Sequence, residues 1–228
     1  MNEPRALLIT GASGTVGTAL LDRLADWPGP LLMVGRARPA RVRSVDRFIA
    51  CDLSDHAATA ETCTHIAAGP PPAALVCAAG QDSRAALGDL NLAAFAECVQ
   101  VNCLAHLQLL HAATTSRPDA DSPLPVVLIS SDVIDQQITG TFAYAAVKAA
   151  AEQAFRHATA DIPPPGLALL LVRLPDIGVP MRAATPGTPP PPSRAGQRPL
   201  PILTAAVETI ARFVTSSHRT AKVEVWHA

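Results

Sequence analysis

The chain has 228 residues, of which 49% are hydrophobic and 16% charged, and its formal net charge is −1. This composition argues against a disordered chain and suits a single α/β domain whose sheet is covered by helices on both faces. A charge so close to zero gives no electrostatic basis for binding nucleic acid or an acidic membrane surface, so we expect a small-molecule ligand.

The first half of the chain alternates short apolar runs with helical patterns. Apolar runs typical of buried parallel strands lie at residues 5–10, 31–34, 47–50 and 72–78. The spacing of leucine and alanine predicts helices at residues 18–26, 55–67 and 90–115, and the last of them should end near Pro118.

The second half continues this alternation around one polar segment. Strands are predicted at residues 125–131, 166–173 and 221–226, and helices at residues 142–160 and 202–216. Residues 175–201 are rich in proline, glycine, threonine and arginine, which predicts a surface loop that closes a substrate pocket. Together these elements predict an α/β fold of the Rossmann type, a doubly wound parallel sheet in a three-layer α/β/α arrangement, formed by one domain over residues 1–228.

Cysteine and histidine spacing predicts neither a disulfide framework nor a metal site. The five cysteines include no CxxC pair, so we expect reduced and mostly buried thiols. His106 and His111 are predicted on the solvated surface of a helix, and Asp132 and Asp135 are predicted to cap a loop. The N-terminal residues have neither the anatomy of a signal peptide nor the length of a membrane span, so a cytoplasmic location is expected by elimination.

A glycine-rich turn between the first strand and the first helix is the first functional signal. Glycines allow the backbone to approach a phosphate closely, and the helix that follows presents N–H groups and a positive dipole end to it. The alternative interpretation is a tight turn that serves only helix–strand packing. The turn predicts a pyrophosphate-binding site formed by Gly11, Ser13, Gly14, Thr15, Val16 and Gly17.

Arg36 predicts which dinucleotide binds. In proteins that prefer NAD a carboxylate after the second strand binds the ribose 2′-hydroxyl, but here Gly35 is followed by Arg36. A guanidinium can bind a 2′-phosphate through two hydrogen bonds, so the sequence favours NADP, although a solvated surface arginine would leave the same pattern. Asp52 and Leu53 follow the third strand, where a carboxylate can meet the adenine amino group.

The pattern Tyr144-Ala145-Ala146-Val147-Lys148, together with the glycine turn and Asp52, resembles the short-chain dehydrogenase/reductase family over nearly the whole chain. The family's catalytic serine commonly lies 13 residues before the tyrosine, which matches Ser131 rather than Ser130 (144 − 131 = 13). The family's helix asparagine matches Asn102. The resemblance implies a compact single-domain oxidoreductase with catalytic residues Ser131, Tyr144, Lys148 and Asn102.

The resemblance also implies further contacts to the dinucleotide. They involve Ala78, Ala79 and Gly80 after the fourth strand, Pro175 and Ile177 after the sixth, and the catalytic residues Tyr144 and Lys148. Three features depart from the common pattern: the turn reads TGxxGxxG, the asparagines usual after the fourth strand are absent, and Asp176 stands where glycine is frequent.

The spacing of Tyr144 and Lys148 predicts an acid–base mechanism. Residues four apart share one face of a helix, and a neighbouring ammonium together with an oxidised nicotinamide favours the phenolate, which would lower the pKa of the phenol. Tyr144 is then expected to protonate a carbonyl oxygen that Ser131 holds in place. The resemblance implies that Lys148 binds the ribose hydroxyls and that Asn102 supports a water molecule.

We therefore expect NADPH-dependent reduction of a ketone or aldehyde, or the reverse oxidation of an alcohol. Two alternatives stay open: a nucleotide-binding sensor or scaffold without turnover, and a non-redox lyase or isomerase that uses the same tyrosine. Arg182, Arg194 and Arg198 of the proline-rich loop could bind an anionic group or simply be solvated. The resemblance also implies a homodimer or homotetramer that pairs through the helices at residues 90–115 and 142–160.

Overall fold

The computed structural model describes residues 5–117, 121–162, 165–177, 200–216 and 223–227. Within these ranges a parallel sheet has the strand order β3-β2-β1-β4-β5-β6-β7. The strands are β1 (Leu7–Thr10), β2 (Leu31–Gly35), β3 (Arg47–Ala50), β4 (Ala74–Cys77), β5 (Leu124–Ser131), β6 (Leu167–Leu174) and β7 (Val223–His227).

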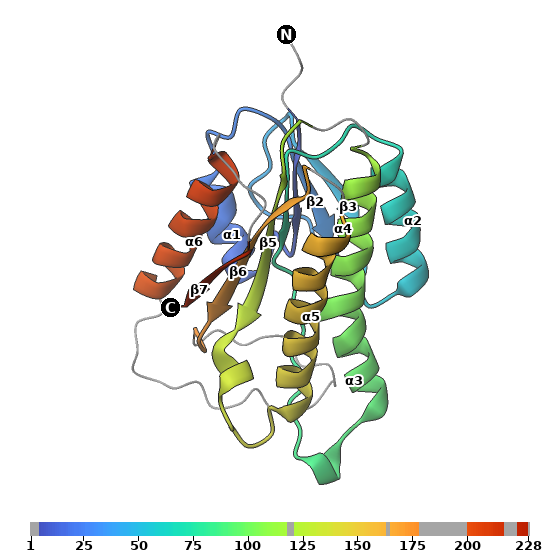
Figure 1. Cartoon of the computed structure of the whole chain (residues 1–228), viewed down its shortest axis with the longest axis vertical. Coiled ribbons are helices and arrows are strands. Elements are labelled where there is room, and N and C mark those ends of the chain that lie inside the picture. Colours follow the sequence, from blue (N-terminus) through green and yellow to red (C-terminus); the bar gives the residue numbers. More distant parts are fainter. Residues whose placement is uncertain (1–4, 118–120, 163–164, 178–199, 217–222, 228) are drawn as a thin grey trace.

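Helices cover both faces of this sheet, as Figure 1 shows. The helices are α1 (Thr15–Arg23), α2 (His56–Ala67), α3 (Leu92–Val99), α4 (Ala105–Thr115), α5 (Phe142–Asp161) and α6 (Leu200–Thr215). Helices α1 and α6 lie on one face, and α2, α4 and α5 lie on the other, with α3 extending below them in the view of Figure 1. The expected doubly wound, three-layer α/β/α arrangement is confirmed.

Two hydrophobic cores form because side chains alternate between the faces of each strand. Leu8, Leu75 and Leu128 belong to the core beneath α4 and α5, whereas Ile9 and Val76 belong to the core beneath α1 and α6. All five side chains are almost completely buried, as expected of parallel strands that are covered on both faces.

The helix predicted over residues 90–115 is present from Leu92 to Thr115, but it contains a π-helical turn that the sequence did not predict. It begins at Leu92, because the Asn91 side chain accepts hydrogen bonds from the N–H groups of Ala93 and Ala94 at 3.0 and 3.1 Å. Between α3 and α4 the chain makes a wider π-helical turn, η2 (Gln100–Leu104). Such a turn redirects side chains relative to a regular helix, and this one contains Asn102.

The proline-rich segment is described only at its two ends. Residues 175–177 follow β6 without regular structure, and residues 200–201 belong to the first turn of α6, so the predicted loop extends too far at this end. Proline is tolerated in the first turn of a helix because the N–H groups there have no helical partner. Arg182, Arg194 and Arg198 lie outside the described residues.

Candidate active site

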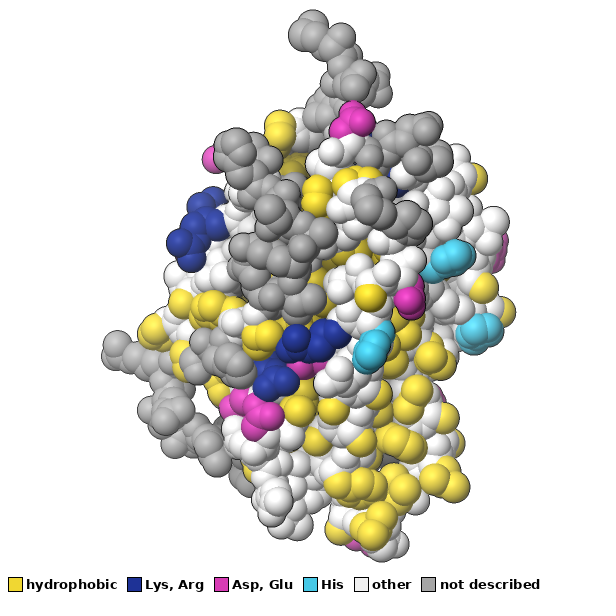
Figure 2. All heavy atoms as spheres, in the orientation of Figure 1, with side chains coloured by type: hydrophobic (Ala, Val, Ile, Leu, Met, Phe, Trp, Pro, Cys, Tyr) yellow, Lys and Arg dark blue, Asp and Glu magenta, His cyan; other side chains and the backbone are white. Residues whose placement is uncertain are grey.

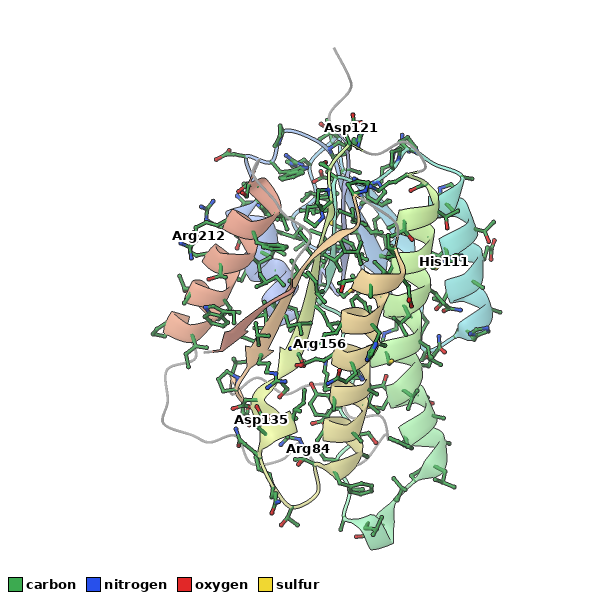
Figure 3. The ribbon with its side chains drawn as sticks, viewed as in Figure 1. Arg84, His111, Asp121, Asp135, Arg156 and Arg212 are labelled. Atoms are coloured by element: carbon green, nitrogen blue, oxygen red, sulfur yellow. The ribbon has the colours of Figure 1, made fainter. Side chains whose placement is uncertain are left out.

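A cavity of about 930 Å³ opens at the edge of the sheet where the parallel strands end. Most lining residues follow strand ends: Gly11 and Ser13–Val16 after β1, Gly35–Ala37 after β2, Cys51–Leu53 after β3, Ala78–Gln81 after β4, Ser130 and Ser131 of β5, and Leu174–Ile177 of and after β6. Tyr144 and Lys148 of α5 also line it. In Figure 3, Arg84 and Asp135 lie at this end of the sheet, and Asp121 lies at the opposite end. The carboxyl edge of an open parallel sheet is where such folds bind ligands.

The glycine turn is shaped by close backbone contacts. Gly11 has a φ of +66°, and a Cβ atom built there would lie 2.6 Å from the backbone nitrogen of Ala79. A Cβ atom on Gly17 would lie 2.6 Å from Cα of Ala12. The N-cap residue of helix α1 is Gly14, which has no side chain, so its first N–H groups have no side-chain cap among the described residues. The turn can therefore hold a phosphate, while Gly17, which does not line the cavity, allows the helix to pack against the turn.

Arg36 and Asp52 lie together at the end of the cavity formed by β2 and β3. Nη1 of Arg36 lies 3.9 Å from Oδ2 of Asp52, and both side chains are nearly half exposed. An exposed pair at this distance is weak, so Arg36 can turn to another anion. Oδ1 of Asp52 accepts hydrogen bonds from the N–H and hydroxyl groups of Ser54 at 3.0 and 2.8 Å.

Thr10 joins the end of β1 to the segment after β4. Its hydroxyl oxygen accepts hydrogen bonds from the N–H groups of Ala78 and Ala79 at 3.1 and 3.0 Å, and it lies 3.2 Å from Nε2 of His106. Because two N–H groups occupy the acceptor sites of the hydroxyl, its proton is available to Nε2 of His106. The imidazole is then neutral, with Nε2 as the acceptor.

The predicted surface position of His106 is wrong, whereas that of His111 is confirmed. His106 is completely buried, because its side of α4 packs against the sheet near the end of β1. Burial, followed by the charge of Lys148, lowers the pKa of His106 to about 3. The sequence holds one signal of this placement, since His106 lies four residues after Asn102.

The side chain of Asn102 forms hydrogen bonds with the backbone of Gln81, in the segment after β4. Its Nδ2 donates to the carbonyl oxygens of Gln81 and Cys98 at 2.7 and 2.9 Å, and its Oδ1 accepts from the N–H of Gln81 at 3.3 Å. Asn102 is fully buried and does not line the cavity. It fixes the loop beside the cavity, and its expected support of a water molecule stays a prediction.

Tyr144 and Lys148 project from adjacent turns of α5 into the cavity. Both side chains are buried, and Nζ of Lys148 donates to the carbonyl oxygen of Ile129 at 3.0 Å. The same Nζ lies 5.6 Å from the centre of the Tyr144 ring. Burial lowers the pKa of Lys148 to about 8, against the opposing influence of Cys98 and other acidic groups.

The pKa of Tyr144 is raised, which is opposite to the direction expected from the sequence. Burial of the phenol is the largest cause, and the Asp82 carboxylate is the next. The Arg84 guanidinium acts in the opposite direction, but its influence is outweighed because desolvation disfavours the phenolate. At neutral pH Tyr144 is therefore a protonated phenol.

Two adjacent serines end β5, and they occupy different surroundings. Ser131 is partly exposed in the cavity, and its Oγ accepts a hydrogen bond from the N–H of Val133 at 3.3 Å, capping the short helix η3 (Asp132–Asp135). Ser130 is more deeply buried, and its hydroxyl lies beside the carboxylate of Glu152. The capping role predicted for Asp135 is wrong, because its carboxylate instead pairs with Arg173.

A charged network connects α5, β6 and η3. Arg173 binds Glu152 through two hydrogen bonds, from Nε at 2.8 Å and from Nη2 at 2.7 Å, and its Nη1 lies 2.6 Å from Oδ2 of Asp135. Glu152 lies one turn beyond Lys148 on the same helix. Sequence reasoning missed this network, because its members are far apart in the chain.

A second ion pair, also missed from the sequence, lies in the segment after β4. Nε of Arg84 is 2.6 Å from Oδ2 of Asp82, and both residues line the cavity. Asp82 is only 5% exposed, and its Oδ1 has no hydrogen-bond partner among the described residues. The only sequence signal was position, since both residues follow a strand at its carboxyl end.

The described residues contain neither a metal-binding cluster nor a membrane-spanning helix. No group of three histidine, cysteine, aspartate or glutamate side chains there could hold a metal ion. None of the helices in the described ranges combines the length and apolarity needed to cross a bilayer.

Comparison with solved structures gives the same fold with either dinucleotide. An oxidoreductase of the short chain dehydrogenase/reductase family from Brucella ovis, in complex with a partially ordered NAD, is 22% identical with a TM-score of 0.74, over 98% of this chain and 99% of that chain. A metagenomic short-chain oxidoreductase in complex with NADP is 20% identical with a TM-score of 0.75, over 99% of this chain and 97% of that chain. A short chain dehydrogenase from Burkholderia cenocepacia J2315 in complex with NADP is 16% identical with a TM-score of 0.73, over 99% and 89%.

Family assignment rests on the sequence itself. No match to the chain was found among curated proteins. A sequence model of the family described as short chain dehydrogenase matches residues 5–188, which is most of the chain. The resemblance seen in the sequence is thereby confirmed, and this chain belongs to the short chain dehydrogenase family.

Proposed function

We propose that this chain reduces a ketone or aldehyde with NADPH, or oxidises the corresponding alcohol, using Tyr144, Lys148 and Ser131. The observation that carries the proposal is that these three side chains line the same cavity as the glycine turn after β1. A buried proton donor and a nucleotide-shaped cradle in one cavity are what a hydride-transfer enzyme requires of its protein.

The cavity fits a dinucleotide along its length. Gly11 allows the turn to lie directly against the backbone of Ala79, and the N–H groups at the start of α1 favour a pyrophosphate. Asp52 and Leu53 would hold the adenine end, and Ala78, Ala79, Gly80, Pro175 and Ile177 would line the path to the nicotinamide. When bound, the nicotinamide supplies the hydride.

Arg36 is the basis for proposing NADP rather than NAD. Among the described residues its guanidinium makes one weak ion pair, with Asp52, and it can bind a 2′-phosphate through two hydrogen bonds. Of the similar structures described above, two contain NADP and one contains NAD, so the choice depends on this residue. Replacing Arg36 with leucine is expected to raise KM for NADPH and to leave KM for NADH nearly unchanged.

The chain's own residues account for the proton. As the carbonyl carbon accepts hydride, the carbonyl oxygen takes the phenolic proton of Tyr144, which its raised pKa keeps in place at neutral pH. Ser131, at the end of β5, donates a hydrogen bond to the same oxygen and orients it. Lys148, with a pKa of about 8, then returns a proton to the phenolate.

Loss of the phenol tests this mechanism. NADPH consumption is measured against a panel of ketones and aldehydes, and Tyr144→Phe is expected to lower kcat by about 10²- to 10⁴-fold. Ser131→Ala should reduce activity strongly, whereas the adjacent Ser130→Ala is the matched control and should retain most of it. A Tyr144→Phe variant as active as the parent would overturn the mechanism.

The other two classes of function are outcomes of the same experiments. If the protein binds NADPH but does not consume it with any of the carbonyl compounds, a sensor or scaffold would be favoured. A product that gains no deuterium from labelled NADPH would favour a lyase or isomerase that uses Tyr144.

Self-association and location complete the proposal. Figure 2 shows hydrophobic side chains over α3 and the neighbouring end of α5, and Leu92, Leu104 and Phe142 are 71%, 44% and 39% exposed. A cluster of this kind favours a partner surface. We propose a homodimer or homotetramer that pairs through these helices and acts in the cytoplasm, which light scattering and cell fractionation would test.

A further inference from the structure

The substrate end of the cavity contains a buried carboxylate with a vacant hydrogen-bond acceptor. We propose that Asp82 selects hydroxyketones and hydroxyaldehydes, binding a hydroxyl close to the reacting carbonyl through its Oδ1 atom. The inference rests on the proposed carbonyl reduction and names the substrate class for it.

The two carboxylate oxygen atoms of Asp82 have different surroundings. Oδ2 is held by Nε of Arg84 at 2.6 Å, which fixes the orientation of the carboxylate. Oδ1 is buried and accepts no well-aligned hydrogen bond from the described residues, although the N–H of Ser83 lies close to the carboxylate. The side chain lines the cavity. A buried acceptor without a partner is costly, so a ligand that supplies a hydrogen-bond donor gains more here than in water.

The position of Asp82 relates this acceptor to the reacting carbonyl. Asp82 and Tyr144, the proposed proton donor, line the same cavity, and the charge of Asp82 helps to raise the pKa of the phenol. A substrate whose carbonyl oxygen meets Tyr144 therefore brings its neighbouring carbons towards Asp82. The hydroxyl that binds there belongs within a few bonds of the carbonyl.

The charges around Asp82 favour a neutral donor. Asp132 and Asp176 also line the cavity, which opposes a carboxylate or phosphate on the substrate. Arg84 already balances the charge of Asp82, so an ammonium group would place a second cation beside the guanidinium. A hydroxyl satisfies Oδ1 without displacing Arg84 and without adding charge.

Pairs of ketones that differ only in the hydroxyl test the proposal. Hydroxyacetone and 2-butanone have nearly the same shape, as do 4-hydroxy-2-butanone and 2-pentanone. We expect kcat/KM to be about ten- to a hundredfold higher for the hydroxylated member of at least one pair, because a hydrogen bond to a buried charged acceptor is among the stronger kind. Equal values within both pairs would overturn the inference and leave the proposed reduction intact.

Asp82→Asn gives the sharpest comparison. The amide oxygen can keep the contact with Arg84, which turns an NH₂ donor towards the cavity in place of the acceptor. The preference for hydroxyacetone over 2-butanone should then fall to near one, and methoxyacetone, which only accepts hydrogen bonds, should gain relative to both. An unchanged preference in Asp82→Asn would overturn the proposal.

Asp132→Asn is the matched control. Asp132 also lines the cavity and also raises the pKa of Tyr144, but its Oδ2 is held by Nε2 of Gln136 at 2.6 Å. Any loss of rate that comes only from a changed phenol should occur in both variants, whereas the hydroxyl preference should change only in Asp82→Asn. Aminoacetone is included with the substrates, and a kcat/KM above that of hydroxyacetone would overturn the assignment to a hydroxyl.

A binding measurement separates this proposal from the proposed reaction. Saturation-transfer NMR compares hydroxyacetone with 2-butanone on the Tyr144→Phe variant, with and without Asp82→Asn. Preferential binding of hydroxyacetone that depends on Asp82 supports the inference even if no ketone is turned over. Equal binding of the two ketones contradicts it.

Discussion

Removing one partner of the buried ion pair between Glu152 and Arg173 should destabilise the fold strongly, because it leaves the other charge without its main partner. The Glu152 side chain is 3% exposed and that of Arg173 is 15% exposed, and they share two hydrogen bonds of 2.7 and 2.8 Å. Replacing Glu152 with leucine leaves a mostly buried guanidinium whose remaining charged partner, Asp135, is 61% exposed. Breaking a buried pair costs about 3–5 kcal/mol, and because Asp135 retains one contact we expect about 3 kcal/mol. For a domain of this size that corresponds to a decrease in Tm of roughly 6–12 °C.

Urea and thermal unfolding followed by circular dichroism provide the assay. The double variant Glu152→Leu/Arg173→Met removes both charges, and its unfolding free energy should lie within about 1 kcal/mol of the parent because apolar pairs can replace buried ion pairs. Arg23 and Glu208 form a pair of the same length, 2.7 Å, on the exposed surface, so Glu208→Gln is the matched control and should have no measurable effect. A Glu152→Leu protein within about 1 kcal/mol of the parent would refute the reasoning, and so would a double variant as unstable as the sum of the single ones.

Three further predictions concern His106, Lys148 and Gly11. The pKa of His106 is about 3 in the folded protein and near 6.5 in the unfolded chain, so only the unfolded chain gains a proton on acidification. Lowering the pH from 7.5 to 5 should therefore reduce the free energy of unfolding, measured with urea, by about 2 kcal/mol more in the parent than in His106→Gln. Identical pH dependence in both proteins would contradict the buried neutral imidazole. The pKa of Lys148 is about 8 in the folded protein against an ordinary 10.5, so the Lys148 ammonium of the unfolded chain keeps its proton to higher pH. Raising the pH from 7 to 9.5 should therefore stabilise the parent by about 2 kcal/mol relative to Lys148→Met. A constant difference between these two proteins would count against the lowered pKa. Gly11→Ala should lower the free energy of unfolding by at least about 1–2 kcal/mol in thermal unfolding, because Gly11 has a φ of +66° and lies close to Ala79. Gly88→Ala is the control, because a Cβ atom at Gly88 would meet open space. Equal effects of the two substitutions would refute the role of the close contact.

Local patterns in the sequence predicted the frame of the cavity. The glycine turn, the strand that ends in Ser131, and the four-residue spacing of Tyr144 and Lys148 are each contained in a few consecutive residues. The structure brings these three groups to one cavity, because every strand of a parallel sheet ends at the same edge.

Contacts between distant residues could not be read in this way. The burial of His106 depends on Thr10, and the orientation of Arg173 depends on Glu152, which lies on another element. The direction of the Tyr144 pKa shift was mispredicted for the same reason, since the ammonium of Lys148 is a sequence neighbour while the desolvation and Asp82 are products of the fold. Helical periodicity also gave no sign of the wide turn that contains Asn102.

The hydrogen bonds of the Thr10 hydroxyl can form only late in folding. Its hydroxyl can meet Ala78 and Ala79 only after β4 has been placed beside β1, and Ser131 and Tyr144 come later still in the chain. Contacts between residues so far apart in sequence form slowly compared with single helices. During refolding, helical ellipticity should therefore return before the proposed affinity for nucleotide does, and a nascent chain released before β5 would have helices but would lack Ser131 and Tyr144.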